Sequence, residues 1–166
     1  MSNYTHADLV RIAALWLQRY SSVVVLTEIR SGSEIADAIG WKKDGHSTLI
    51  ECKASKADFR QDRKKFFRQV HELGIGQSRY FMAPKGLLNA QDLPKKWGLL
   101  EVAGNRVYLS RRSQPHGRYN LPAENKLLIS CVRRLGQDPP QNMVVKAYRY
   151  PTKCTGTIGV VDESDV

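Results

Sequence analysis

The chain has 166 residues, of which 26 are Lys or Arg and 16 are Asp or Glu, so its formal net charge is +10. Hydrophobic residues make up 42% of the sequence and charged residues 25%, which argues against a disordered, collagen-like or coiled-coil protein. A single domain with a hydrophobic core is expected at this length. Apolar runs such as residues 23–26 are far shorter than the roughly 18 residues of a membrane span.

The cysteines and histidines exclude two further classes of protein. Three cysteines (Cys52, Cys131 and Cys154) are an odd number without metal-binding spacing, which indicates a reduced protein rather than a disulfide scaffold. The four histidines are too widely scattered for a zinc motif. The start of the chain does not resemble a signal peptide, so we expect a cytoplasmic protein that does not bind membranes.

Helical and alternating patterns predict the secondary structure in chain order. A capping-box pattern at Thr5 and Asp8 begins a helix over residues 5–20. Strands are expected over residues 23–29, 34–41 and 47–53. A second helix follows over residues 56–73, with an apolar stripe of Phe59, Phe66, Phe67, Val70 and Leu73. The later elements are strands at 79–83, 99–102 and 106–110, a helix at 122–135 and a last strand within 143–150.

The order helix, three strands, helix, strand predicts an α/β protein with a mixed sheet and helices packed on it. We expect the α/β core to span residues 1–110 and a C-terminal helix and strand extension, packed on that core, to span residues 111–155. Residues 156–166 are expected to form a flexible, polar and acidic tail.

Positive charge is concentrated in one segment. Residues 42–68 hold nine basic and four acidic residues, which is half of the net charge. Such a footprint makes nucleic acid the leading partner. On the predicted helix, Arg60, Arg63, Lys64 and Arg68 lie opposite the phenylalanines, either as a solvated face or as a ridge that contacts phosphates. Arg111, Arg112 and Arg118 form a second, smaller basic cluster.

Two carboxylates are predicted to meet across a hairpin. On the first strand, alternation places Asp37 on one face together with Ile35, Ile39 and Trp41. A three-residue loop with Gly45 in the left-handed conformation would place Asp37 opposite Glu51, with Cβ atoms about 5 Å apart. A divalent cation would offset the repulsion between the two charges, because Mg²⁺ is commonly held by one or two carboxylates with waters and phosphates.

Lys53 follows Glu51 by two residues and shares its face of the strand, about 7 Å further along. An ammonium there could contact a phosphate or the attacking water. The three residues would then combine a Lewis acid, an activated water and a charge stabiliser, which are the requirements of phosphodiester hydrolysis. The alternative is an ordinary ion pair between Lys53 and Glu51 on a solvated face.

Residues 35–41 (Ile-Ala-Asp-Ala-Ile-Gly-Trp) and 49–59 (Leu-Ile-Glu-Cys-Lys-Ala-Ser-Lys-Ala-Asp-Phe) resemble the PD-(D/E)XK nuclease superfamily. The likeness is greater to the MmcB-like DNA-repair nucleases and related phage-encoded proteins, and it continues in residues 62–64, 80–87 and 97–102. It covers roughly residues 5–105. Ala36 stands where proline is common, and no clear Q-x-x-x-Y pattern of the RecB-type subgroup follows.

The resemblance implies a restriction-endonuclease-like core and a set of site residues. Asp37 and Glu51 would be ligands of Mg²⁺ or Mn²⁺, Lys53 the catalytic lysine, and Glu28 a further acidic residue at the metal. The first helix often adds another group, which would be His6 or Asp8. The residues expected to bind DNA are Lys56, Arg60, Arg63, Lys64 and Arg68.

The expected function is therefore a metal-dependent deoxyribonuclease in DNA repair, recombination or phage DNA processing. One alternative is a catalytically inactive module of the same fold that binds DNA or a protein partner. Another is an adaptor or inhibitor that presents its basic helix to an acidic protein. The sequence leaves the oligomeric state open, a homodimer included.

Overall fold

The chain begins with a helix and three consecutive strands, and a second helix separates these from the next strands. The computed structural model describes residues 4–31, 34–62, 64–65, 70–134, 144–147 and 159–161. In chain order the elements are α1 (His6–Arg19), β1 (Val24–Ser31), β2 (Glu34–Trp41), β3 (Ser47–Cys52), α2 (Lys56–Asp62), the 3₁₀ turn η1 (His71–Leu73), β4 (Ser78–Pro84), the 3₁₀ turn η2 (Ala90–Asp92), β5 (Gly98–Ala103), β6 (Arg106–Arg111), α4 (Leu121–Arg134), β7 (Val144–Ala147) and β8 (Gly159–Val161).

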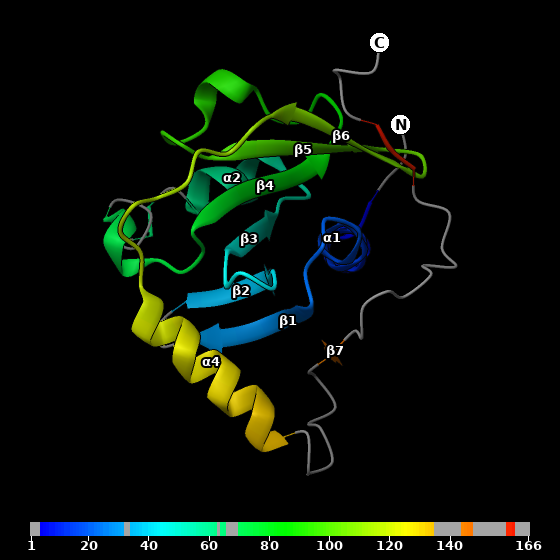
Figure 1. Cartoon of the computed structure of the whole chain (residues 1–166). Helices are drawn as coiled ribbons and strands as arrows, with labels where there is room; N and C mark the ends of the chain where they lie inside the picture. Colours follow the sequence, from blue (N-terminus) through cyan, green and yellow to red (C-terminus); the bar gives the residue numbers. More distant parts are fainter. Residues whose placement is uncertain are drawn as a thin grey trace.

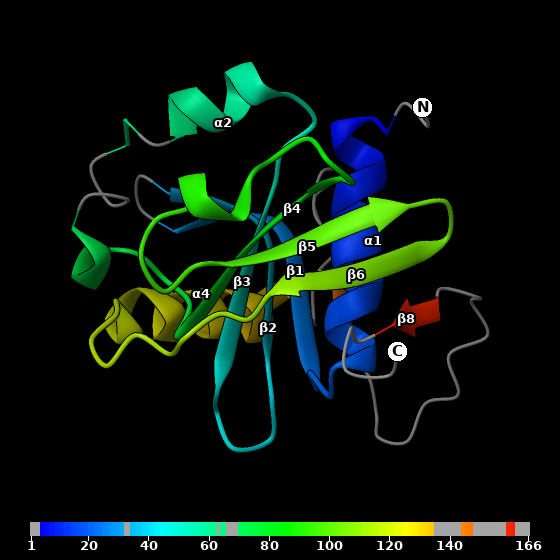
Figure 2. The same cartoon turned by 90° about the horizontal axis from the view of Figure 1, so that it is seen from above.

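A single mixed sheet separates α1 from α2 and α4 (Figures 1 and 2). Its strand order is β7-β1-β2-β3-β4-β5-β6-β8. The first three strands pair antiparallel, β3, β4 and β5 pair parallel, and β6 returns antiparallel to β5. The predicted α/β fold with a mixed sheet is confirmed. Helix α2 lies in the crossover between β3 and β4, a connection that parallel strands require.

Helix α1 begins where the capping pattern predicts. The Thr5 hydroxyl accepts the backbone N–H of Asp8, and the Asp8 carboxylate accepts the backbone N–H of Thr5. The inner face of α1, which includes Leu9, Trp16 and Leu17, is buried against the sheet in one of the two apolar clusters. The predicted first helix is confirmed, and its N-terminus is fixed above the β2–β3 hairpin.

The β2–β3 hairpin has the predicted loop and register. Gly45 adopts φ +83°, and the backbone N–H of Lys42 donates to the His46 carbonyl over 2.9 Å. The ladder pairs Ala38 with Ile50. Continued by one residue, that register would place Asp37 opposite Glu51, but the observed ladder ends at the pair of Ala38 and Ile50.

The alternation of faces shifts by one residue at Asp37, which the sequence did not predict. Ala36 and Ile39 belong to the cluster under α2 and α4 although they lie three residues apart, whereas Ile35 is 44% exposed. The opposite position on β1 is Glu28, whose φ is +50°. This left-handed residue interrupts the pleat, so the prediction that Ile35 shares a face with Ile39 is wrong.

Helix α2 is shorter than predicted. It ends at Asp62, Lys64 and Lys65 lie in a turn and a bend, and residues 71–73 form η1. The position three residues after Phe59 holds Asp62, so the apolar stripe that would bury a longer helix is interrupted there. The predicted stripe residues Phe66 and Phe67 lie outside the described residues.

The C-terminal part of the chain contributes to the core through α4. The buried carboxylate of Glu124 accepts hydrogen bonds from the Trp41 indole, the Ser47 hydroxyl and the backbone N–H of Gly76. Strand β7, within the predicted strand 143–150, pairs with β1. Of the predicted tail, residues 159–161 form β8 and the rest lies outside the described residues. Within the described ranges, no helix is long and apolar enough to cross a membrane.

Candidate active site

Asp37 lies where β2 leaves its ladder with β3, and both of its oxygens have a neighbour. Oδ2 accepts the backbone N–H of Cys52 over 2.7 Å, which ties Asp37 to the end of β3. Oδ1 lies 3.5 Å from Nε2 of His6, at the start of α1. The carboxylate is 13% exposed, so it stays partly accessible to solvent.

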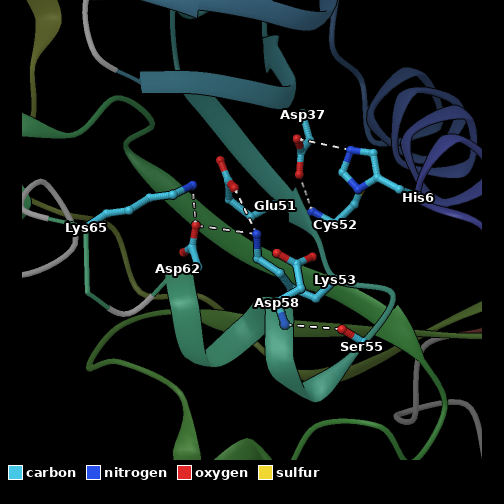
Figure 3. A network of polar contacts seen from close by, with 9 residues as sticks. All are labelled: His6, Asp37, Glu51, Cys52, Lys53, Ser55, Asp58, Asp62 and Lys65. Atoms are coloured by element: carbon cyan, nitrogen blue, oxygen red, sulfur yellow. Dashed lines mark hydrogen bonds and ion pairs between the residues drawn. The ribbon is translucent and has the colours of Figure 1, made fainter.

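Glu51 and Lys53 lie beside Asp37 and are almost completely buried. Glu51 is 1% exposed and Lys53 is 3% exposed. The Lys53 ammonium lies 3.5 Å from Glu51 Oε2 and 3.4 Å from Oδ1 of Asp62, which α2 contributes. Figure 3 shows these side chains gathered between His6 of α1 and Asp62 of α2. The structure therefore brings the three predicted catalytic residues together, and the alternative of a solvated ion pair does not fit their burial.

The surroundings of Lys53 keep it charged. Burial would lower the pKa of its ammonium, but the negative charges of Glu51 and Asp62, assisted by Asp37 and Asp58, outweigh burial and raise the pKa. A raised pKa keeps Lys53 protonated at neutral pH. It can thus act as a positive charge beside Glu51 and Asp62.

The start of α1 places His6, and not Asp8, beside Asp37. Asp8 is engaged by Thr5 in the capping box, and this hydrogen bonding lowers the pKa of its carboxyl. His6 instead faces the site, and its hydrogen bond with Asp37 raises the pKa of the imidazole. Of the two residues, His6 is the one that contacts Asp37.

Glu28 lies opposite Asp37 in the register, but its side chain is not part of the buried cluster. It is exposed and lines a pocket of about 180 Å³ between β1 and α1, together with Val10 and Arg11. Its backbone has the left-handed conformation described above. The structure therefore does not place Glu28 with Glu51 and Lys53.

The donor set fits a hard divalent cation with few protein ligands. Asp37 and Glu51 supply carboxylate oxygens from neighbouring strands, and Mg²⁺ is often held by one or two carboxylates completed by waters and phosphates. In the part of the chain that the structure describes, no group of three or more His, Cys, Asp or Glu side chains is placed to hold a metal ion. Waters and substrate would have to complete the coordination.

Of the predicted DNA-binding residues, Lys56 and Arg60 lie on α2, and Lys64 lies in the turn after it. Lys56, Arg60 and Lys64 are exposed. Lys56 and Arg60 line a groove of about 370 Å³ between the start of α2 and residues 86–92. Arg63 and Arg68 lie outside the described residues. We call Lys56, Arg60 and Lys64 the basic surface of α2.

The sequence prediction missed Asp62 and Lys65. Asp62 is 1% exposed, and its Oδ1 lies 2.7 Å from the Lys65 ammonium in addition to its contact with Lys53. One feature of the sequence could have indicated the role of Asp62. A carboxylate three residues after Phe59 occupies the buried face of the helix, and a charged residue there needs a partner.

The thiol of Cys52 lies apart from this polar cluster, although its backbone N–H binds Asp37. Its thiol is buried in the cluster beneath α1, beside Ala38 and Ile50. Burial raises the pKa of the thiol well above its ordinary value, so little thiolate forms near neutral pH. The prediction that Cys52 is a small apolar residue directed away from Glu51 and Lys53 is confirmed.

Comparison with known proteins supports the architecture. No protein-family model matches the chain, and no curated protein matches it. A solved structure of similar fold is a protein of unknown function from Silicibacter pomeroyi, with a TM-score of 0.63 and 22% identity, covering 81% of this chain and 91% of that chain. At that identity the likeness concerns the fold alone.

Proposed function

We propose that this protein is a metal-dependent deoxyribonuclease with a restriction-endonuclease-like core and a site made by Asp37, Glu51 and Lys53. The observation that carries the proposal is the burial of Glu51 and Lys53 at the end of β3, where the N–H of Cys52, the residue between them, binds Asp37. Burying ionised groups is costly, and charged clusters of this kind concentrate at functional sites. The resemblance of residues 35–41 and 49–59 to PD-(D/E)XK nucleases supports the same assignment.

Each residue has a distinct task in this proposal. Asp37 and Glu51 would hold Mg²⁺ or Mn²⁺, which when bound supplies a Lewis acid and an activated water. Lys53 remains an ammonium and stabilises the negative charge that develops on the phosphate. The Cys52 N–H orients Asp37, because it fixes one carboxylate oxygen and leaves the other directed toward His6.

The direct test of this function is a cleavage assay on supercoiled plasmid and on single-stranded DNA, with Mg²⁺, Mn²⁺ or EDTA. We expect cleavage with either metal and none with EDTA. The variant Glu51→Gln removes one carboxylate charge and should be inactive under all conditions. DNA binding without cleavage by the wild type in both metals would instead favour the inactive binding module.

The basic surface of α2 should contact phosphates, so DNA affinity should fall linearly in log salt with a slope of about −0.9 per phosphate neutralised. Replacing Lys56, Arg60 and Lys64 by Ala should flatten the slope by roughly 2 to 3. Binding titrations over a range of salt concentrations measure this change.

The matched control replaces Lys126 and Arg133, two exposed cations of α4, and should leave the slope nearly unchanged. If the α2 variant keeps the wild-type slope, the DNA path lies elsewhere, and Arg111 and Arg112 are the next residues to replace.

A further inference from the structure

We propose that Asp62 is a positioning residue that, together with Glu51, holds the Lys53 ammonium in place. This inference rests on the proposed function, because it assigns Asp62 a part in the same reaction. Asp62 does not touch the reacting phosphate in this account and acts through Lys53.

Two contacts from different elements define the position of Lys53. Its ammonium lies 3.5 Å from Glu51, two residues earlier on β3, and 3.4 Å from Asp62 on α2. A lysine side chain has a flexible stem and a compact charge, so a single ion pair leaves its head free to move. Anchors on a strand and on a helix restrict that movement, and such support from outside the reacting groups gives a site its geometry.

The burial of Asp62 is difficult to explain by stability alone. Apolar residues of similar volume often stabilise a protein as well as a buried ion pair does, or better. Asp62 occupies the helix face that also carries Phe59, where an apolar residue would continue the packing. The carboxylate is nevertheless 1% exposed. A role in positioning Lys53 would explain why a charged residue is kept at this buried place.

Lys65 completes the charge pattern. Its ammonium lies 2.7 Å from the same Asp62 oxygen that faces Lys53, and its side chain is 46% exposed. Along the network Glu51, Lys53, Asp62 and Lys65, negative and positive charges alternate (Figure 3). Lys65 thus offsets the second negative charge near Lys53 and connects the buried network to solvent. A cation held by Glu51 would compete with Lys53 for that carboxylate, and Asp62 would then be its remaining anchor.

The first test requires no cleavage activity. In the metal-free protein with ¹³C- and ¹⁵N-labelled lysine, nuclear magnetic resonance detects ordered ammonium groups, and the Lys53 signal is assigned by its absence in Lys53→Arg. We expect a sharp signal in the wild type and a broadened or lost signal in Asp62→Asn. The control Asp58→Asn removes a charge from the same helix and should keep the signal. An unchanged Lys53 signal in Asp62→Asn would overturn the positioning role.

The second test uses cleavage. Asp62→Asn should lower kcat by about 10²-fold, as expected for a misplaced catalytic group, with little change in the KM for DNA. In a Lys53→Arg background the same substitution should cost almost nothing more, because its effect passes through Lys53. A full additional loss in that background would contradict the proposal.

A third variant keeps the proposal testable if Asp62→Asn does not fold. Asp62→Glu keeps the charge but displaces it, so a folded protein with a shifted Lys53 signal and a reduced kcat is expected, and a wild-type signal and kcat would overturn the proposal. If the wild type cleaves no DNA, the proposed nuclease function is contradicted. The resonance experiment still tests whether Asp62 positions Lys53, because it needs no cleavage.

Discussion

Replacing Lys53 by Ala is expected to lower the rate of metal-dependent DNA cleavage by about 10²- to 10³-fold, the usual cost of removing a group that stabilises charge in the transition state. Mn²⁺ and DNA should still bind, because Lys53 is not a proposed ligand of the cation. Single-turnover cleavage measures the rate, and separate titrations with Mn²⁺ and with DNA measure the two affinities. Wild-type turnover in this variant would remove Lys53 from the mechanism.

The folding of the Lys53→Ala variant must be checked in this experiment. Lys53→Ala leaves the buried carboxylates of Glu51 and Asp62 without the ammonium between them, and breaking a buried ion pair costs about 3–5 kcal/mol. Lys53→Arg keeps the charge with a different shape, so it should fold better and still cleave slowly. Lys126→Ala, an exposed lysine of α4, should match the wild type in rate and stability.

Replacing Asp37 by Asn is expected to abolish cleavage with either metal. The amide oxygen can still accept the Cys52 N–H that the carboxylate accepts over 2.7 Å, so the local structure should persist while the negative charge is lost. In EDTA we expect the free energy of unfolding to change by no more than about 1 kcal/mol, because a lost charge-assisted hydrogen bond is offset by relief of the repulsion from Glu51.

The control for Asp37→Asn comes from the same hairpin. Asp44 lies in the exposed loop, where its carboxylate accepts the backbone N–H of His46, a bond that Asn also makes. Asp44→Asn should therefore cleave DNA at the wild-type rate. Plasmid cleavage time courses of the two variants separate a lost catalytic charge from a general effect of an Asn in this hairpin.

Local rules were sufficient to predict the hairpin and the start of the first helix. Gly45 selects the loop, and the loop sets the register that pairs Ala38 with Ile50, next to Asp37 and Glu51. Thr5 and Asp8 form the capping box that their spacing predicts. These features depend on residues a few positions apart, which is the range over which sequence patterns are informative.

The errors arose where distant contacts override local patterns. The left-handed backbone at Glu28 shifts the alternation of β2, which no pattern in residues 34–41 indicates. Helix α2 ends early at Asp62, which is buried by its ion pairs with Lys53 and Lys65 rather than by apolar packing. His6 could be chosen over Asp8 only when the position of α1 over the hairpin was known.

Thermal melts of the wild type and Asp37→Asn, in EDTA and in Mn²⁺, test whether Asp37 and Glu51 hold a metal ion. A cation held by Asp37 and Glu51 stabilises the folded state by linkage, so at a Mn²⁺ concentration of about 100 Kd the melting temperature of the wild type should rise by roughly 5–10 °C. The Asp37→Asn variant should melt near the wild type in EDTA and should hardly respond to Mn²⁺. Equal shifts in the two proteins, or no shift in the wild type, would contradict a metal site at Asp37 and Glu51.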